Sequence, residues 1–316
     1  MKRVTYILIV VAMSAIFGVS QTSQASPNAL PETNAALAQL SGAGTCRAEE
    51  PIATVEAPTL GELWILRPVE INLQLHLEQA PDKAVVERIL NSVEAHNPDW
   101  RVTVFVSPHF ALSDPDAVRA IERRGHQIAV VGTGEQLPLT TLSYNEQRAS
   151  LERAMLAVRA AVYYPQEVVD WKPQDFDWNA DTLLALQSLQ VRSISDLFTC
   201  GDSFLCQCPY ALNLGKVTFP YPMQTEFWAI PISEIQQGSE ALALDDRRVF
   251  AGSVTPQDYL GYLLQKYGEQ QETKDPLIIA VHPSIVGMDD ARLEVLDLFL
   301  DHVVNTGGKL VTLNNL

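Results

Sequence analysis

The sequence contains only six histidines, and no two of them stand at a spacing that is typical of a zinc site. HxxH, HxxxH and HExxH pairs are all absent, which argues against a conventional zinc centre. The chain also lacks a GxSxG turn, a P-loop and a GxGxxG stretch after a strand. Gly132-Thr133-Gly134 follows an expected strand, but no helix begins there, so we do not expect a phosphate cradle. These absences exclude several common classes of hydrolase and nucleotide-binding protein.

Positive charge is scarce. The chain has 22 lysines and arginines against 38 aspartates and glutamates, and its formal net charge is −16. Nucleic acids and anionic membrane surfaces select basic patches, so we expect neither as a partner. The acidic balance keeps an exported protein soluble and leaves neutral or aminated glycans as partners.

A long apolar run occurs only at the N-terminus. Lys2 and Arg3 precede an apolar stretch over residues 4–19, and residues 23–25 (Ser-Gln-Ala) form a small-x-small cleavage site. This is the anatomy of a secretory signal peptide, which we assign to residues 1–25. The alternative is an uncleaved membrane anchor, but the run is shorter than the roughly 20 residues that span a bilayer. We therefore expect a secreted or periplasmic protein with no membrane segment after cleavage.

The chain has four cysteines, Cys46, Cys200, Cys206 and Cys208. Cysteines that enter an oxidising compartment form disulfides by default. Cys206 and Cys208 are too close to pair with each other comfortably, so we expect Cys200 to pair with one of them and Cys46 to be available for the other. A zinc site is the alternative, but the spacing matches no common ligand pattern.

Expected strands and helices alternate along residues 67–316, after an Ala-, Ser-, Pro- and Gly-rich extension or linker over residues 26–66. Residues 70–77 alternate apolar and polar side chains, which is typical of a strand. Asp114-Pro115 and the Ser143/Glu146 capping box mark helix starts. Further strands are expected at 102–106, 127–131, 168–171, 191–194, 227–233, 277–281 and 309–313. The alternation favours a parallel α/β barrel or doubly wound sheet in a single domain, with an irregular insertion at about 200–250.

The segment Arg124–Val158 resembles the second signature block of the polysaccharide deacetylase (NodB-homology, carbohydrate esterase) family. In that block a strand ends in two metal-binding histidines and leads into a helix that begins at an LTxLS sequence. Weaker similarities follow in the family's order at 101–106, 116–128, 181–191, 280–283 and 308–313. The resemblance covers about residues 68–316 and implies a distorted (β/α) barrel with its site at the C-terminal ends of the strands.

The resemblance also implies a chemistry, and the sequence departs from it. In the family an Asp-Asp pair supplies the general base and a metal ligand, and the two histidines complete a site that activates water to attack an N-acetyl group. Here the histidines fall on Val131 and Glu135, and the Asp-Asp pair falls on Gln74-Leu75. We therefore expect no metal at the family's position. His282 does match the family's general acid.

Other residues offer a rebuilt site. His76 and Glu78 share one face of the first strand, because side chains alternate along a strand. Lys172 stands where the family has an arginine and keeps its positive charge, but not its bidentate fork. The candidate set is His76, Glu78, Glu135, Lys172 and His282. The alternative is that the two strand residues only face solvent or bond locally.

Three tryptophans are candidates for a glycan platform, because aromatic rings stack on the apolar faces of sugars. Trp171, Trp178 and Trp228 are expected near the mouth of the barrel. The competing interpretation is that they are buried core residues.

These features predict an exported deacetylase-like protein that is catalytically degenerate, needs no cofactor, and binds a glycan or a cell-envelope polymer. The alternative is an active deacetylase or esterase on N- or O-acetylated glycan, with the rebuilt site and a divalent metal such as zinc.

Overall fold

The computed structural model describes residues 68–78, 82–135, 137–196, 221–222, 227–237, 240–252, 254–287 and 289–316. The expected signal peptide and extension lie outside these ranges, as do all four cysteines. Among the residues in these ranges, no helix is both long enough and apolar enough to cross a membrane.

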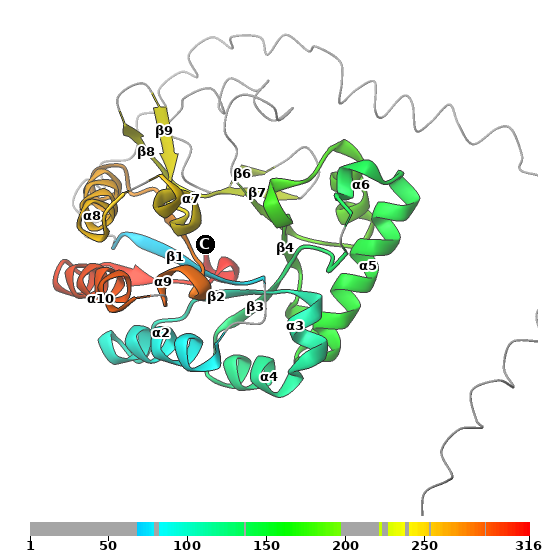
Figure 1. Ribbon diagram of the computed structural model, residues 1–316, viewed down its shortest axis with the longest axis horizontal. Helices are drawn as coiled ribbons and strands as arrows, with labels where there is room; N and C mark the ends of the chain where they lie inside the picture. The colour runs from blue at the N-terminus through cyan, green and yellow to red at the C-terminus, as the bar shows by residue number, and fades with distance from the viewer. Residues whose placement is uncertain are drawn as a thin grey trace, which may run out of the picture. The chain divides into compact units, whose positions relative to one another are not determined.

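A curved sheet forms the centre of the fold (Figure 1). Its strand order is β10-β1-β2-β3-β4-β5-β7-β6, with β11 beside β1, and every pairing is parallel except that of β6 with β7. After β7 the chain reaches β10, where the Ser233 amide donates to the Ile278 carbonyl over 3.0 Å. The sheet is therefore a nearly closed barrel, as the sequence predicts. The strands are β1 (Glu70–Leu77), β2 (Thr103–Val106), β3 (Gln127–Val131), β4 (Asp170–Lys172), β5 (Ser193–Asp196), β6 (Tyr221–Pro222), β7 (Trp228–Pro231), β10 (Leu277–Val281) and β11 (Lys309–Leu310).

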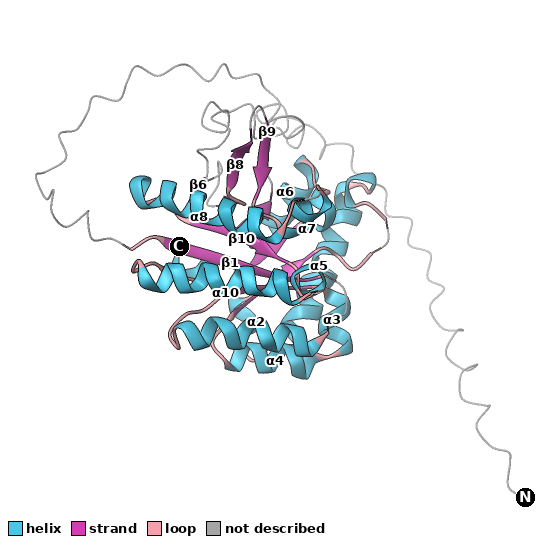
Figure 2. Ribbon diagram, turned by 60° about the vertical axis from the view of Figure 1, so that its left-hand side comes forward, coloured by secondary structure: helices cyan, strands magenta, loops and turns pink. Residues whose placement is uncertain are grey.

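Helices surround the barrel, and a separate hairpin stands beside α7 and α8 (Figure 2). The hairpin consists of β8 (Glu234–Gln237) and β9 (Glu240–Ala243). The helices are α2 (Lys83–His96), α3 (Pro108–Ser113), α4 (Pro115–Arg123), α5 (Tyr144–Ala160), α6 (Ala180–Ser188), α7 (Asp246–Ala251), α8 (Pro256–Thr273), α9 (Pro283–Val286) and α10 (Asp290–Asn305).

The alternation along β1 sorts its side chains between two environments. Ile71, Leu73, Leu75 and Leu77 belong to the main apolar cluster, which also includes the buried stripes of the surrounding helices. The polar side chains between them are buried as well, because the other face of the strand lines the interior of the barrel. Asn72, Gln74 and His76 are each no more than 2% exposed. A strand covered on both faces thus carries its polar residues inward rather than into solvent.

Local signals in the sequence place several helix starts correctly. Asp114 accepts a hydrogen bond from the Ala117 amide over 3.1 Å at the start of α4, and Ser143 and Glu146 form the expected capping box of α5. The described part of the expected insertion at about 200–250 contains regular elements. The strand expected at 227–233 is β7, whereas the β8–β9 hairpin and α7 are too short for their periodicity to be recognised in the sequence.

The C-terminal segment closes one end of the barrel. The Leu313 amide donates to Thr103 Oγ1 over 3.0 Å and the Asn314 amide donates to Gln127 Oε1 over 3.1 Å. Thr103 and Gln127 begin β2 and β3, so this is the N-terminal end of the parallel strands. A functional site therefore has the opposite end available, as is usual in α/β barrels.

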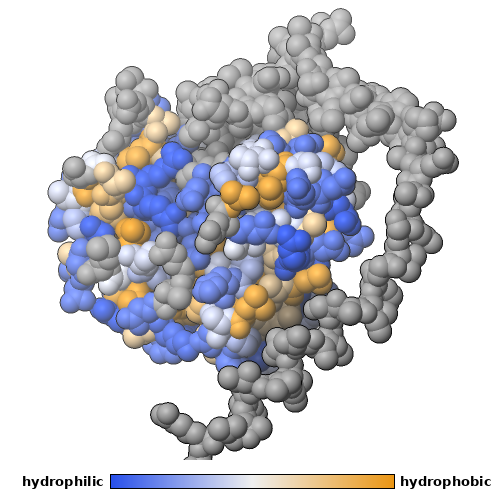
Figure 3. All heavy atoms as spheres, turned by 45° about the vertical axis from the view of Figure 1, so that its right-hand side comes forward, coloured by the Kyte–Doolittle hydropathy of each residue, from blue (hydrophilic) through white to orange (hydrophobic). Residues whose placement is uncertain are grey.

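Large exposed apolar side chains are scattered over the surface. The face in Figure 3 shows hydrophobic residues interspersed with hydrophilic ones. The most exposed are Leu112 at 69% and Leu137 at 63%. Singly exposed apolar residues are common on protein surfaces and do not by themselves indicate an interface.

His126 gives the fold a dependence on pH. Its Nδ1 accepts the Val102 amide over 3.3 Å, so Nε2 carries the proton and faces Glu94 Oε1 at 3.1 Å. Burial lowers the pKa of His126 from 6.5 to about 4, and the nearby Glu94 carboxylate opposes this shift only in part. The folded state therefore holds the ring neutral after the unfolded chain has begun to protonate it.

We expect this histidine to cost stability in mild acid. Its contribution is fully present above pH 6.5 and is lost as the pH falls toward 4, by about 2 kcal/mol between pH 7 and pH 5. Urea unfolding of the wild type and of His126→Gln at both pH values measures this difference, because the variant lacks the titrating ring. Equal changes in the two proteins would contradict the assignment.

Candidate functional site

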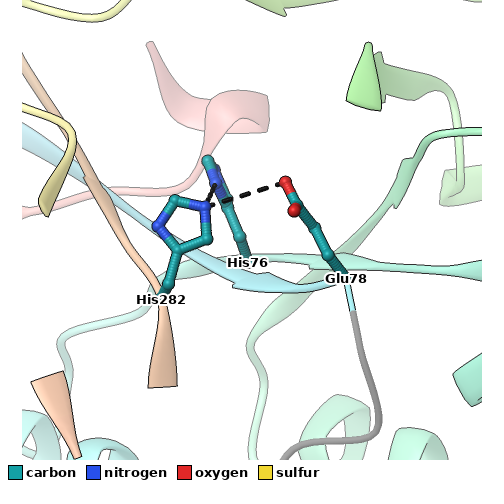
Figure 4. A group of neighbouring side chains, drawn as sticks. All are labelled: His76, Glu78 and His282. Carbon is teal, nitrogen blue, oxygen red and sulfur yellow. Dashed lines mark hydrogen bonds and ion pairs between the residues drawn. The ribbon is translucent and has the colours of Figure 1, made fainter. Parts of the chain in front are cut away.

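Three ligand-type side chains meet at the open end of the barrel. His76 and Glu78 come from the end of β1, and His282 directly follows β10, which pairs with β1 in parallel. The Nε2 atom of His282 lies 3.2 Å from His76 Nδ1 and 3.7 Å from Glu78 Oε1. Figure 4 shows that both contacts meet at this one nitrogen. All three residues belong to the predicted candidate set.

A carboxylate from α7 fixes the ring of His282. Asp246 Oδ1 lies 2.6 Å from His282 Nδ1, and Asp246 Oδ2 accepts the His282 backbone amide over 2.9 Å. Asp245 lies next to it and caps α7 by accepting the Arg247 amide over 3.1 Å. Because Asp246 is an acceptor, Nδ1 of His282 carries a proton, and the ring presents Nε2 to His76 and Glu78.

Arg247 holds the third side chain. Its guanidinium donates to Glu78 Oε2 over 2.5 Å and lies 3.5 Å from Asp175 Oδ1. The other oxygen of Glu78, Oε1, remains directed at His282. Charge-assisted bonds of this kind fix the direction of a carboxylate as well as stabilising it.

The charges at the site shift its pKa values in opposite directions. Burial disfavours protonation of His282, but the Asp246 and Glu78 carboxylates outweigh it and raise the pKa of His282 to about 9. Burial also raises the pKa of Glu78, yet the hydrogen bond from His282 and the positive charges of Lys172 and Arg247 bring it to about 2. For His76, burial and the charge of Lys172 both hold the pKa well below 6.5.

Lys172 belongs to this environment. It is the last residue of β4, is only 1% exposed, and its charge acts on both His76 and Glu78. The structure thus brings together four of the five predicted candidates. The fifth, Glu135, is placed elsewhere.

Glu135 is the first correction to the candidate set. Its carboxylate accepts a hydrogen bond from Ser150 Oγ over 2.7 Å and pairs with Arg153, both on α5. Glu135 is absent from both of the metal-capable groups found among the described residues. The loop after β3 turns at Gly132 and Gly134, which both have positive φ, and this turn directs Glu135 toward the outer helix.

The three tryptophans do not form the predicted glycan platform together. Trp171 is 1% exposed and donates from Nε1 to the Gly132 carbonyl over 3.0 Å, so no sugar can stack on it. Trp228 is 38% exposed, but it begins β7 and pairs with Ser193, the first residue of β5, which places it at the end opposite the site. Trp178 is half-buried and donates to Asp196 at the C-terminal end of β5. Of the three, only Trp178 is both at the site end of the barrel and partly exposed.

Sequence reasoning missed the residues that position the site. Asp246 and Arg247 lie in the part of the chain expected to be irregular, and Gln74 was considered only as a lost base. Gln74 Oε1 in fact lies 3.4 Å from His76 Nε2. The available signal was the sequence 245–248 (Asp-Asp-Arg-Arg). An aspartate commonly caps the start of a helix, so this sequence could have indicated α7.

Two groups of described residues place three potential metal ligands within 4.8 Å of one another. The first is His76, Glu78 and His282, and the second is Asp245, Asp246 and His282. At the positions where the resemblance implies histidines, Val131 is a buried apolar residue of the barrel interior and Glu135 is paired with α5. The residues present do not fit the family's metal arrangement.

The fold is a nearly closed parallel α/β barrel with ionisable side chains at the C-terminal ends of its strands. In a comparison with known proteins, residues 73–194 match the model of the polysaccharide deacetylase family. Over this segment the chain is similar to the family, as a divergent relative. No curated protein matches the sequence.

Solved structures share the fold at low sequence identity. The PuuE allantoinase aligns with a TM-score of 0.60 and 15% identity, over 78% of this chain and 88% of that one. A protein described as a probable polysaccharide deacetylase from Pseudomonas aeruginosa PAO1 aligns with a TM-score of 0.59 and 15% identity, over 77% and 86%. A CE4 family pseudoenzyme from Bacillus anthracis aligns with a TM-score of 0.50 and 15% identity, over 79% and 66%.

Proposed function

We propose that this protein binds an acylated glycan at the C-terminal end of its barrel and removes an acyl group there, using His76, Glu78 and His282. The observation that carries the proposal is the convergence of His76 Nδ1 and Glu78 Oε1 on His282 Nε2. Asp246 and Arg247 hold two of these side chains from behind. Supporting side chains that fix the geometry of a cluster in this way are typical of a functional site.

The side chains support acyl transfer to water in distinct ways. His282 Nε2 and His76 Nδ1 lie 3.2 Å apart at the open end of the barrel, beside which a water molecule and an acyl carbonyl would bind. Lys172 supplies a buried positive charge beside them, which favours the negative charge that develops on the carbonyl oxygen. A divalent cation bound at this point would polarise the carbonyl and lower the pKa of water.

The N-terminal sequence supports export. A basic start, an apolar run over residues 4–19 and a small-x-small site at 23–25 are typical of a signal peptide, and extracellular or periplasmic polymers are then the accessible glycans. N-acetylated or O-acetylated cell-envelope glycan is therefore the proposed substrate class.

The second candidate function is glycan binding without catalysis. It is favoured by Gln74-Leu75, Val131 and Glu135 at the positions where the family holds its base and its metal. In this second candidate, His76, Glu78 and His282 contact the bound sugar but do not catalyse a reaction.

Acetate release separates the two candidates. Wild-type protein incubated with chitooligosaccharide and with acetylated peptidoglycan fragments should release acetate above the protein-free rate. If both ligands bind, as measured by calorimetry, and neither is deacetylated, the non-catalytic candidate stands and the proposed activity is wrong.

The aromatic residue that serves glycan binding can be tested by a matched pair of substitutions. Trp178→Ala is expected to weaken glycan binding about tenfold, which is about 1.4 kcal/mol, because it removes a ring at the site end of the barrel. Trp228→Ala removes an equally large ring at the other end and should leave affinity within about twofold. A stronger effect from Trp228 would place the glycan at the wrong end for this proposal.

A further inference from the structure

A chain of hydrogen-bonded side-chain amides inside the barrel determines which ring nitrogen of His76 carries the proton. Asn72 donates from Nδ2 to the backbone carbonyl of Val311 over 2.9 Å, and a carbonyl only accepts, so the orientation of this amide is fixed. Asn72 Oδ1 therefore faces Gln74, which donates to it from Nε2 over 3.0 Å. Gln74 Oε1 is left to accept from Ser195 Oγ at 2.9 Å and from His76 Nε2 at 3.4 Å. The proton of the neutral His76 ring is thus on Nε2.

When His282 is neutral, the two histidines present lone pairs to each other. His76 has its proton on Nε2 and a lone pair on Nδ1. Neutral His282 has its proton on Nδ1, directed at Asp246, and a lone pair on Nε2. These two lone-pair atoms are 3.2 Å apart. Two acceptors at this distance repel each other unless a cation lies between them, which is either a proton or a metal ion.

The distances fit a metal ion. Two zinc–ligand bonds of about 2.0 to 2.1 Å at the tetrahedral angle place their donor atoms about 3.3 to 3.4 Å apart. The His76–His282 nitrogens are separated by 3.2 Å, and Glu78 Oε1 lies 3.7 Å from the same His282 nitrogen. A proton needs only two of these atoms, whereas a metal uses all three.

The supporting side chains match what a metal site needs. A histidine ligand normally donates its other nitrogen to a carboxylate or a carbonyl oxygen, which fixes the ring and raises its basicity. Asp246 does this for His282, and the Gln74 amide oxygen does it for His76. Arg247 occupies one oxygen of Glu78 and leaves the other as a single-atom ligand.

The geometry points to a divalent metal site, of the zinc type, with His76 Nδ1, Glu78 Oε1 and His282 Nε2 as its three protein ligands. These ligands come from the ends of β1 and β10 and share no position with the two histidines that the family places after β3. The inference deepens the proposed function, because it concerns the same site, but the binding of the metal can be measured without any turnover.

The test is metal binding to the purified protein. The chelator-stripped, thiol-blocked protein is titrated with Zn²⁺ by calorimetry and with Co²⁺ by visible absorption. We expect one equivalent of each, a raised melting temperature, and a Co²⁺ spectrum of nitrogen and oxygen coordination. His76→Ala and the milder Glu78→Gln should each weaken binding by at least about 100-fold, and Asp246→Asn by about 10- to 100-fold. His302→Ala, on the outer helix α10, is the matched control and should bind as the wild type does.

Three outcomes would overturn the inference. No bound metal would mean that a proton alone occupies the gap. Metal binding that persists in His76→Ala but is lost in Asp245→Asn would place the metal in the neighbouring Asp245–Asp246–His282 group. Metal that survives every substitution would be bound elsewhere in the chain. Circular dichroism of each variant shows whether it is folded.

The metal titration and the acetate assay test the metal site and the proposed activity separately. One equivalent of metal without acetate release would support the metal site and reject the proposed activity. Acetate release by a protein that binds no metal in the titration would support the activity and reject the metal site.

Discussion

Replacement of His282 by alanine is expected to reduce acetate release by about 10²- to 10⁴-fold, the usual contribution of a residue that supplies the central proton or ligand contact. His282 Nε2 is the atom on which His76 and Glu78 converge, and Asp246 fixes it there. Removal of the imidazole therefore removes the atom that His76 and Glu78 both contact. Initial rates on acetylated chitooligosaccharide measure the effect.

The control for this substitution is His302→Ala. His302 is a second histidine of the chain, on α10, and its ring contacts Tyr267 rather than the site. We expect its rate to equal that of the wild type. His282→Asn retains a polar side chain and serves if the alanine variant is unstable. A rate that is unchanged in both His282 variants would show that the catalytic residues lie elsewhere.

The strands and the barrel follow from patterns that are local in the sequence. The alternation of Ile71, Leu73 and Leu75 with polar residues predicts β1 with its observed bounds, and residues 277–281 predict β10 equally well. Helix caps at Asp114 and Ser143 are local as well. What the alternation alone does not decide is where the polar face points. In an open antiparallel sheet it would meet water, whereas closure of the barrel buries it.

Part of the site is also predictable, because parallel strands bring their C-terminal ends together. This rule and the family resemblance nominate His76, Glu78 and His282 correctly as neighbours, although 206 positions separate the two histidines. The same separation explains why spacing rules for zinc ligands detect nothing here. Those rules describe ligands on one helix or one turn, whereas the side chains of this cluster come from the ends of two strands.

The supporting residues were not predictable in the same way. Asp246 and Arg247 reach the site only because α7 lies against β10, a tertiary contact with no local signature. The direction of Glu135 depends on two glycines with positive φ, and a register count along the loop cannot supply it. Trp171 is in a short strand whose two faces are both covered, so its aromatic character indicates a core residue.

Replacement of Asp170 by alanine is expected to lower the free energy of unfolding by about 3 to 5 kcal/mol. Asp170 is fully buried at the start of β4 and accepts hydrogen bonds from three side chains. These are Gln127 Nε2 at 2.6 Å, Ser193 Oγ at 2.6 Å and Arg192 Nη2 at 2.5 Å. The substitution leaves the guanidinium without its carboxylate and removes the acceptor of the buried Ser193 hydroxyl, whereas Gln127 Nε2 keeps Asn314 Oδ1 as an acceptor. Urea unfolding at pH 7 measures the loss.

Asp116→Ala is the matched control for Asp170→Ala. Asp116 also accepts a hydrogen bond from an arginine, Arg119, but its side chain is 89% exposed, so its removal should change stability by less than about 1 kcal/mol. Asp170→Asn keeps the shape and loses the charge, and we expect an intermediate value. Equal effects at Asp170 and Asp116 would show that burial adds nothing to this pair.

The Asp170 variant also separates stability from the chemistry of the site. Gln127 accepts a hydrogen bond from Thr103, and Thr103 accepts one from Asn72, so a polar chain runs through the barrel from Asp170 toward Gln74 and His76. The Asn72 amide is held independently by the Val311 carbonyl. The orientation of His76 should therefore survive the loss of Asp170. Below its melting temperature, Asp170→Ala should bind Zn²⁺ with wild-type affinity, and weaker binding would mean that the orientation of His76 depends on the whole chain rather than on its last links.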